Sequence, residues 1–284
     1  MGIFSNGTTT ASTIAELAPE SVLLAGAGRA ILLQLAYPPV GHGVARHSGF
    51  VEDPLARLHG TLTYIYALTN GTRAQADAAR RWVERAHAPV HADAATDGSH
   101  PAYDANDPRA QLWVAATLYD SAMVVYEALF PPLPAVTAER IYREYAILGT
   151  ALRLPADAWP ATRADFAAYW ESMSAQLSVD RTILKVGRNL LAARNAPAWV
   201  RMLMPVARLL TAGLLGPELR AGFGLRYGPV HDAVFRALLR TVALVYPRLP
   251  ARLRHAPLHF YLRRLDAFSS PSADAPSTTG PSAR

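Results

Sequence analysis

Apolar residues recur along most of this chain at the three-to-four-residue spacing of a helix, and no segment alternates for long with the two-residue period of a strand. The segments between these runs are rich in proline and aspartate and lack the short turns of hairpins. The pattern therefore predicts an all-α fold, a single globular domain of roughly ten helices.

Helix boundaries are predicted from capping residues and prolines beside the apolar runs. The expected helices start near Thr13, Pro19, Pro54, Arg73, Pro108, Thr137 and Thr162, followed by helical stretches over 178–195 and 198–215 and by later helices to about Asp266. Tyr37 precedes a proline and should be extended, so the second helix should end there and a pliable, glycine-containing loop should follow.

The chain of 284 residues divides into three parts by composition. Residues 1–12 form a polar lead, which we expect to be flexible, and residues 13–266 carry the helical pattern. From Ala267 the sequence is rich in serine, proline and alanine and almost uncharged, which predicts a disordered tail over 267–284.

Composition narrows the possible chemistry. Hydrophobic residues make up 51% of the chain and charged residues 18%, which suits a compact body or one with an internal ligand cavity. The formal net charge is +6, but the arginines of the last third are interleaved with leucine, alanine and proline rather than with stacking aromatic residues, so no nucleic-acid partner is expected. The lack of cysteine excludes disulfides, thiolate catalysis, cysteine-ligated zinc and iron–sulfur clusters.

The N-terminus lacks the basic and apolar regions of a signal peptide, so we expect a cytoplasmic protein. An apolar run over 22–40 approaches the length that spans a membrane, but Arg29, Gln34 and two glycines interrupt it. The run is therefore predicted to be buried inside the protein. Peripheral contact with a membrane stays open.

Residues 22–61 combine this apolar run with several chargeable side chains, which suggests a lined internal pocket. Arg29 stands among alanine, isoleucine and leucine, and His42 and His47 follow the prolines. Arg57 and Thr61 lie four residues apart and should share one face of the helix that begins at Pro54. The alternative is two core helices joined by a loop, with Arg29 satisfied by a carboxylate.

His87 and His91 have the four-residue spacing of a helical metal-binding pair. Pro89 lies between them and should end or kink the helix near His87, so the two imidazoles need not point the same way. A non-haem metal hydrolase using His87, His91 and Asp93 is one alternative. The motifs of serine hydrolases, dinucleotide-binding folds and His-Glu-x-x-His zinc enzymes are absent, and a helical body without cysteine is compatible with haem held by one imidazole.

Two ordered blocks carry a resemblance to a known family. The first is Gly28-Arg29-Ala30-x-Leu32-Leu33-Gln34-x-Ala36-x-Pro38 with Gly43-Val44-x-x-His47-Ser48-x-Phe50-x-x-Asp53-Pro54-x-x-Arg57-Leu58-x-x-Thr61, and the second joins His87-x-x-Val90 to Tyr103-x-Ala105-x-Asp107-Pro108 and Trp113-Val114-x-Ala116-Thr117-Leu118-x-Asp120-Ser121. They resemble the DUF2236 family of MpaB-type oxygenases and rubber oxygenases (latex clearing proteins). The likeness extends over about residues 20–264.

The resemblance implies an all-α protein that binds haem b and uses dioxygen to cleave a carbon–carbon double bond of a small, apolar, isoprenoid-like substrate. His87 matches the axial iron ligand, with His91 as the fallback. Arg57 and Thr61 match the arginine and threonine on the opposite side of the haem, where they would stabilise bound oxygen. Arg29 and His47 match positions that would pair with haem propionates or set the polarity of the pocket.

The chain also departs from the family pattern. Rubber oxygenases carry a lysine just before the threonine, where this chain has Gly60, and many relatives have a histidine at the position of Ala115. Rubber oxygenases are secreted, whereas this chain shows no signal peptide. We therefore expect its substrate to be a smaller, intracellular apolar alkene rather than rubber. The remaining alternative is a non-enzymatic helical module that binds an apolar ligand or a membrane surface.

Overall fold

The computed structural model describes residues 11–47 and 54–269, whose regular elements are helices except for one short hairpin. In chain order the elements are α1 (Ile14–Leu17), η1 (Ser21–Gly26), α2 (Ala27–Ala36), α3 (Pro38–Arg46), α5 (Pro54–Asn70), α6 (Arg73–His87), β1 (His91–Ala92), β2 (Tyr103–Asp104), α7 (Pro108–Leu129), α8 (Ala135–Tyr145), α9 (Ile147–Thr150), α10 (Arg163–Ser174), α11 (Arg181–Ala192), α12 (Ala198–Leu214), α13 (Pro217–Gly222), α14 (Pro229–Val245), η2 (Tyr246–Arg248), α15 (Ala251–Arg254) and α16 (Ala256–Ser269). The predicted all-α fold is confirmed. The helices exceed the roughly ten expected because several are single turns.

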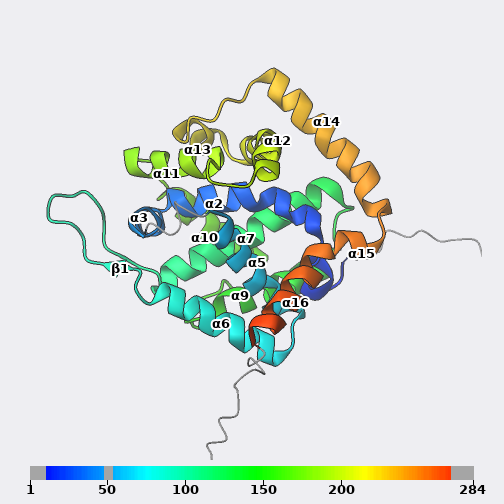
Figure 1. The fold of residues 1–284 in the computed structure, drawn as a ribbon, viewed down its shortest axis with the longest axis horizontal. Coiled ribbons are helices and arrows are strands. Elements are labelled where there is room, and N and C mark those ends of the chain that lie inside the picture. The colour runs from blue at the N-terminus through cyan, green and yellow to red at the C-terminus, as the bar shows by residue number, and fades with distance from the viewer. Residues whose placement is uncertain (1–10, 48–53, 270–284) are drawn as a thin grey trace, which may run out of the picture.

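The core is built around α2 and α7, which pack against each other through the middle of the molecule (Figure 1). Fully buried side chains of the core include Leu32 and Leu35 of α2 and Trp113 of α7, whose indole N–H donates to the carbonyl of Leu33 at 3.1 Å. In Figure 1, α6 and α16 lie on one side of this pair, and α12 and α14 lie on the other. Each side of the core thus has its own covering layer of helices.

The apolar run over 22–40 is buried or partly buried, with no exposed residue, as its interrupting polar residues predicted. Leu32, Leu33, Leu35 and Ala36 are 4% exposed or less. Among the described residues no single helix has the length and apolar character to cross a membrane; the pair Ser21–Ala36 and Pro38–Arg46 meets both criteria together but is bent by 99°.

Three local predictions are wrong. Pro38 and Pro39 begin α3 instead of opening a loop, because prolines fit the first turn of a helix, where the backbone N–H groups have no intrahelical acceptor. The expected helix from Pro19 is a 3₁₀ segment, η1, before α2 starts at Ala27. The sequence pattern indicates no strand, yet β2 pairs antiparallel with β1 in a short hairpin.

Most predicted helix starts are confirmed. The Asp107 carboxylate accepts from the Arg109 N–H at 2.8 Å, and Thr162 and Asp165 form a reciprocal capping box. α1 follows Thr13, but the Thr13 side chain makes no capping hydrogen bond. Asp53 lies outside the described residues.

The predicted tail begins slightly too early, because α16 continues through residues 267–269 to Ser269. The rest of the tail and residues 1–10 of the lead lie outside the described part of the chain. Their flexibility stays a prediction.

Candidate active site

Two cavities meet near the middle of the molecule. The first, called here the His87 cavity, has a volume of about 180 Å³ and is lined by residues of α2, α3, α5, α6, β2, α7 and α9. Its polar lining residues include Gln34, Arg57, Thr61, His87 and Gln111. Apolar side chains complete its wall: Trp82, Val83, Val114, Leu118, Leu148 and Leu152. Side chains remote in sequence thus surround one small space.

The second, called here the apolar cavity, has a volume of about 370 Å³ and lies between η1, α2, α5, α7 and α12. Its wall is almost entirely hydrocarbon. Gln34, Arg57, Thr61 and Leu118 line both cavities, so they form the partition between them. A ligand in the apolar cavity therefore lies next to the same arginine and threonine that face His87.

His87 is the last residue of α6, where the helix ends before Pro89 as the sequence predicted. Its Nδ1 atom is buried and has no hydrogen-bond partner in the described structure. Burial, together with the positive charge of Arg57, lowers the pKa of His87 to about 4, against the opposing effect of Asp104. The imidazole is therefore neutral at physiological pH and keeps a buried nitrogen unused by the protein.

Arg57 is held by a chain of hydrogen bonds that runs into the core. Its Nη2 donates to Gln34 Oε1 at 2.9 Å, and Gln34 Nε2 donates to Thr117 Oγ1 at 3.0 Å. The Thr117 hydroxyl in turn donates to the carbonyl of Val114 at 2.8 Å. Burial lowers the pKa of Arg57 to about 10, so the guanidinium still carries its charge at neutral pH.

Thr61 lies one helical turn after Arg57 and lines both cavities with it, as their four-residue spacing predicted. Between them, buried Gly60 lies under the ring of Trp82 from α6. A Cβ atom added at Gly60 would lie 2.2 Å from Trp82 Cη2 and 2.7 Å from Cζ3. Trp82 therefore fills the space above this position, and α6 could not approach α5 so closely at a larger residue.

Three of the candidate site residues lie elsewhere. Arg29 lines neither cavity and instead forms an ion pair with Asp120 at 2.6 Å, with further hydrogen bonds to Ser121 Oγ and the carbonyl of Leu214. This is the carboxylate-satisfied arrangement of the alternative interpretation. His47 contacts the ring of Tyr103, which lines the His87 cavity, but His47 does not line it.

His91 is exposed on β1 and does not join His87 at the cavity, because the chain turns at Pro89. Within residues 11–47 and 54–269 no group of three or more histidine, aspartate or glutamate side chains is arranged to hold a metal ion. The hydrolase alternative with His87, His91 and Asp93 therefore has no geometric support. His42, also noted in the sequence, hydrogen-bonds Asp180 at 2.7 Å.

Sequence reasoning missed the two glutamines of the His87 cavity as functional candidates. Gln34 is 4% exposed and Gln111 is 6% exposed, and both belong to otherwise apolar helix faces. Gln111 donates to the carbonyl of Ala105 and accepts from the N–H of Arg153, which fixes it at the cavity wall. A buried amide in an apolar helix requires hydrogen-bonding partners. A glutamine on an apolar helix face was therefore the sequence feature that could have identified these two residues.

The family model for the catalytic domain of ER-bound oxygenase mpaB/B'/rubber oxygenase matches residues 16–244. Two curated relatives, uncharacterized protein Rv2237 of Mycobacterium tuberculosis and uncharacterized protein Mb2261 of Mycobacterium bovis, are each 34% identical over 227 residues, which are 78% of this chain and 88% of the relative. Among solved structures, latex clearing protein in the closed state aligns with a TM-score of 0.60 at 16% identity, over 89% of this chain and 73% of that chain. At that identity the structural likeness establishes a shared fold.

Proposed function

The chain belongs to the mpaB and rubber oxygenase catalytic-domain family, and from that membership we propose that it is a haem b-dependent oxygenase. Its substrate is a small apolar, isoprenoid-like alkene, which it oxygenates or cleaves at a carbon–carbon double bond with dioxygen. The observation that carries the proposal is the meeting of His87, Arg57 and Thr61 around one cavity. We propose a cytoplasmic location for the protein.

The donor set fits haem. A histidine that serves as the axial iron ligand must be neutral and have a free nitrogen lone pair, and His87 has a lowered pKa and a buried, unpartnered Nδ1. The cavity of about 180 Å³ is smaller than the usual ligand pocket of about 300 Å³ or more, so binding requires its wall to open. Trp82 lines the cavity, is 47% exposed, and is the side chain we expect to move.

Haem, when bound, supplies the activation of dioxygen, and the protein supplies orientation and electrostatics. Arg57 keeps its charge and is fixed by Gln34, so it presents preorganised donors that stabilise negative charge developing on oxygen. The Thr61 hydroxyl adds a second, neutral donor on the same helix face. Gly60 contributes no ammonium group at the position where rubber oxygenases carry a lysine.

The apolar cavity suits the proposed substrate. Its wall is mostly hydrocarbon. Its charged lining residues are Glu20, which already pairs with Arg254, and Arg57 at the partition, where Thr61 also faces the cavity. An apolar alkene bound there would bring its double bond beside those two residues, while a charged substrate would lose its hydration without compensation. This favours a compact hydrocarbon chain over a polar metabolite.

The test is an absorption spectrum and iron analysis of protein expressed with haem supplied. We expect a Soret band and one iron per chain, and we expect His87→Ala to abolish both. The matched control is His91→Ala, which removes an exposed imidazole four residues away and should leave the spectrum unchanged. A folded wild-type protein without a Soret band, or a His87→Ala protein with the wild-type spectrum, would refute haem ligation by His87.

The apolar cavity also favours a second candidate, a non-enzymatic module that stores or carries an apolar ligand. The two candidates differ in product formation. Incubation with an isoprenoid alkene and dioxygen yields oxygenated products, or carbonyl fragments where the double bond is cleaved, from an oxygenase, whereas a carrier returns the alkene unchanged.

A further inference from the structure

The outward face of α12 is hydrophobic. Trp199, Met202, Leu203 and Val206 follow the spacing of a single helix face, and they are 65%, 80%, 57% and 45% exposed. We call these four residues the α12 stripe. Large apolar side chains are ordinarily scattered singly on a soluble surface, so a contiguous stripe on one helix indicates a site that meets another apolar phase.

The α12 stripe lies at the opening of the apolar cavity. Leu203 belongs to the stripe and also lines that cavity. Val200, Met204 and Ala207, on the adjoining face of the same helix, line the cavity as well. A residue that is both exposed and part of the wall stands where the cavity reaches the surface. The helix therefore separates the cavity from the outside and is apolar on both faces.

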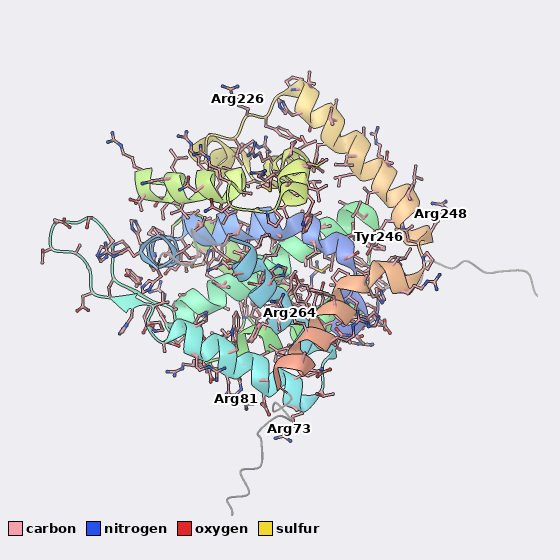
Figure 2. All side chains as sticks on the ribbon, in the orientation of Figure 1. Arg73, Arg81, Arg226, Tyr246, Arg248 and Arg264 are labelled. Carbon is pink, nitrogen blue, oxygen red and sulfur yellow. The ribbon has the colours of Figure 1, made fainter. Side chains whose placement is uncertain are left out.

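The two helices α11 and α12, with the segment that joins them, carry charge of one sign. Residues 181–217 contain no aspartate or glutamate and carry six cations, Arg181, Lys185, Arg188, Arg194, Arg201 and Arg208. All six are exposed, and none forms an ion pair with a carboxylate within the described part of the chain. Arg226 projects outward near the start of α14, at the top of the view, and Arg248 projects outward near the other end of α14, at the right-hand edge (Figure 2).

We propose that α11 and α12 dock this protein on an anionic lipid bilayer, with the α12 stripe inserted among the acyl chains and the surrounding cations on the headgroups. Apolar residues flanked by arginine and lysine, with a tryptophan at the edge, are the composition of an interfacial helix. A second copy of the chain fits less well, because a two-fold contact through this face would bring the six cations of each copy together.

Docking in this orientation turns the opening of the apolar cavity toward the hydrocarbon of the bilayer. An apolar ligand can then pass from lipid to cavity without crossing water, where its transfer is unfavourable. The docking surface rests on α11 and α12 and not on haem. If the proposed function also holds, the surface explains how a water-insoluble alkene reaches Arg57 and Thr61.

Co-sedimentation with vesicles tests the surface, using phosphatidylcholine alone and phosphatidylcholine mixed with phosphatidylglycerol. We expect binding to the anionic vesicles, weakening with salt, and a blue shift of tryptophan emission that Trp199→Phe removes. Replacing Met202, Leu203 and Val206 with serine should lower the partition coefficient by at least about tenfold. Lys185→Glu with Arg201→Glu should lower it on anionic vesicles only. The matched control is Val136→Ser, which removes a 74% exposed valine on α8 and should bind as wild type.

Each alternative gives a different result. Vesicle binding that the serine and glutamate variants leave unchanged would overturn the proposal, as would absence of binding to anionic vesicles. A concentration-dependent dimer that the serine variant abolishes would assign the stripe to a second copy instead. Because vesicle binding is measured on protein with or without haem, its outcome is independent of the Soret test of His87.

Discussion

At the scale of single residues, the His87 cavity holds two side chains that can both carry positive charge. Burial disfavours a charge on either, and Arg57 keeps its proton because its pKa starts far higher and Gln34 accepts one of its hydrogen bonds. The retained charge of Arg57 then helps to keep His87 neutral. Arg57 therefore has two effects in the cavity. It presents hydrogen-bond donors, and it helps to keep the nitrogen lone pair of the neutral His87 imidazole available.

This arrangement predicts a pH dependence for the haem-free protein. The folded pKa of His87, about 4, lies below its unfolded value of about 6.5, so the unfolded chain binds the proton more tightly. Stability is therefore full above the unfolded pKa and falls as the pH drops through the window toward 4, by up to about 3 kcal/mol. Urea unfolding of the wild-type and His87→Gln proteins at a series of pH values measures this loss in the free energy of unfolding.

His87→Gln should show a flatter decline in the free energy of unfolding across that window. The variant keeps a polar side chain of similar size but cannot take up a proton. Equal slopes for the two proteins would mean that the imidazole titrates normally in the fold.

Sequence alone predicted the central residues because their geometry is local or belongs to the family pattern. Arg57 and Thr61 share a helix face by spacing, and the resemblance supplied His87 as their counterpart. The alternative interpretation gave Arg29 a carboxylate partner but could not say which one, because Asp120 is remote in the chain and spacing gives no sign of the contact. Each role in catalysis stays a prediction.

At the scale of elements, the contact of α5 with α6 depends on one small residue. Gly60 is buried in the helix that carries Arg57 and Thr61, and the ring of Trp82 occupies the place of its missing side chain. Glycine within a helix costs about 1 kcal/mol relative to alanine, so the position would gain from alanine if nothing lay above it. The close packing of Trp82 reverses that preference.

A double-mutant cycle tests this contact. We expect Gly60→Ala to destabilise the wild-type protein by about 1–2 kcal/mol through overpacking against Trp82. In a Trp82→Ala background the same change should stabilise by about 0.5–1 kcal/mol, because only the helix propensity remains. Denaturant unfolding of the wild type, the two single variants and the double variant gives the coupling free energy between positions 60 and 82. Identical effects of Gly60→Ala in both backgrounds would show that the tryptophan does not fill this space.

Elements were predicted best where a capping residue sits directly before an apolar run, as at Asp107 and Thr162. The segment after Pro38-Pro39 was expected to be a loop but is a helix. Proline can end one helix and also begin the next, and the sequence pattern does not show whether a loop or a new helix follows. The β1–β2 hairpin has two-residue strands, too short for any alternating pattern to be visible.

At the scale of the whole molecule, the two ends of the described fold are joined at Glu20. This buried carboxylate accepts from Tyr246 Oη at 2.8 Å and from Arg254 Nη1 at 2.5 Å, and His255 Nε2 lies 3.2 Å away. The chain then continues into α16, which packs along α5. Tyr261 of α16 hydrogen-bonds His59, which lies two residues from Arg57 and Thr61. The Glu20–Arg254 ion pair therefore holds α16 in place, and α16 in turn packs against α5, the helix that carries Arg57 and Thr61.

Glu20→Ala should destabilise the protein by about 3 kcal/mol, because Arg254 and Tyr246 would lose their acceptor in a buried setting. Hydrogen exchange should rise first in α15 and α16 and then in α5, since release of the C-terminal helices uncovers that packing face. The matched control is Glu127→Ala, which removes an exposed carboxylate 3.9 Å from Arg163 and should cost less than about 1 kcal/mol. A Glu20→Ala protein no less stable than the control, with unchanged exchange in α16, would show that apolar packing alone holds the C-terminal helices to the site helix.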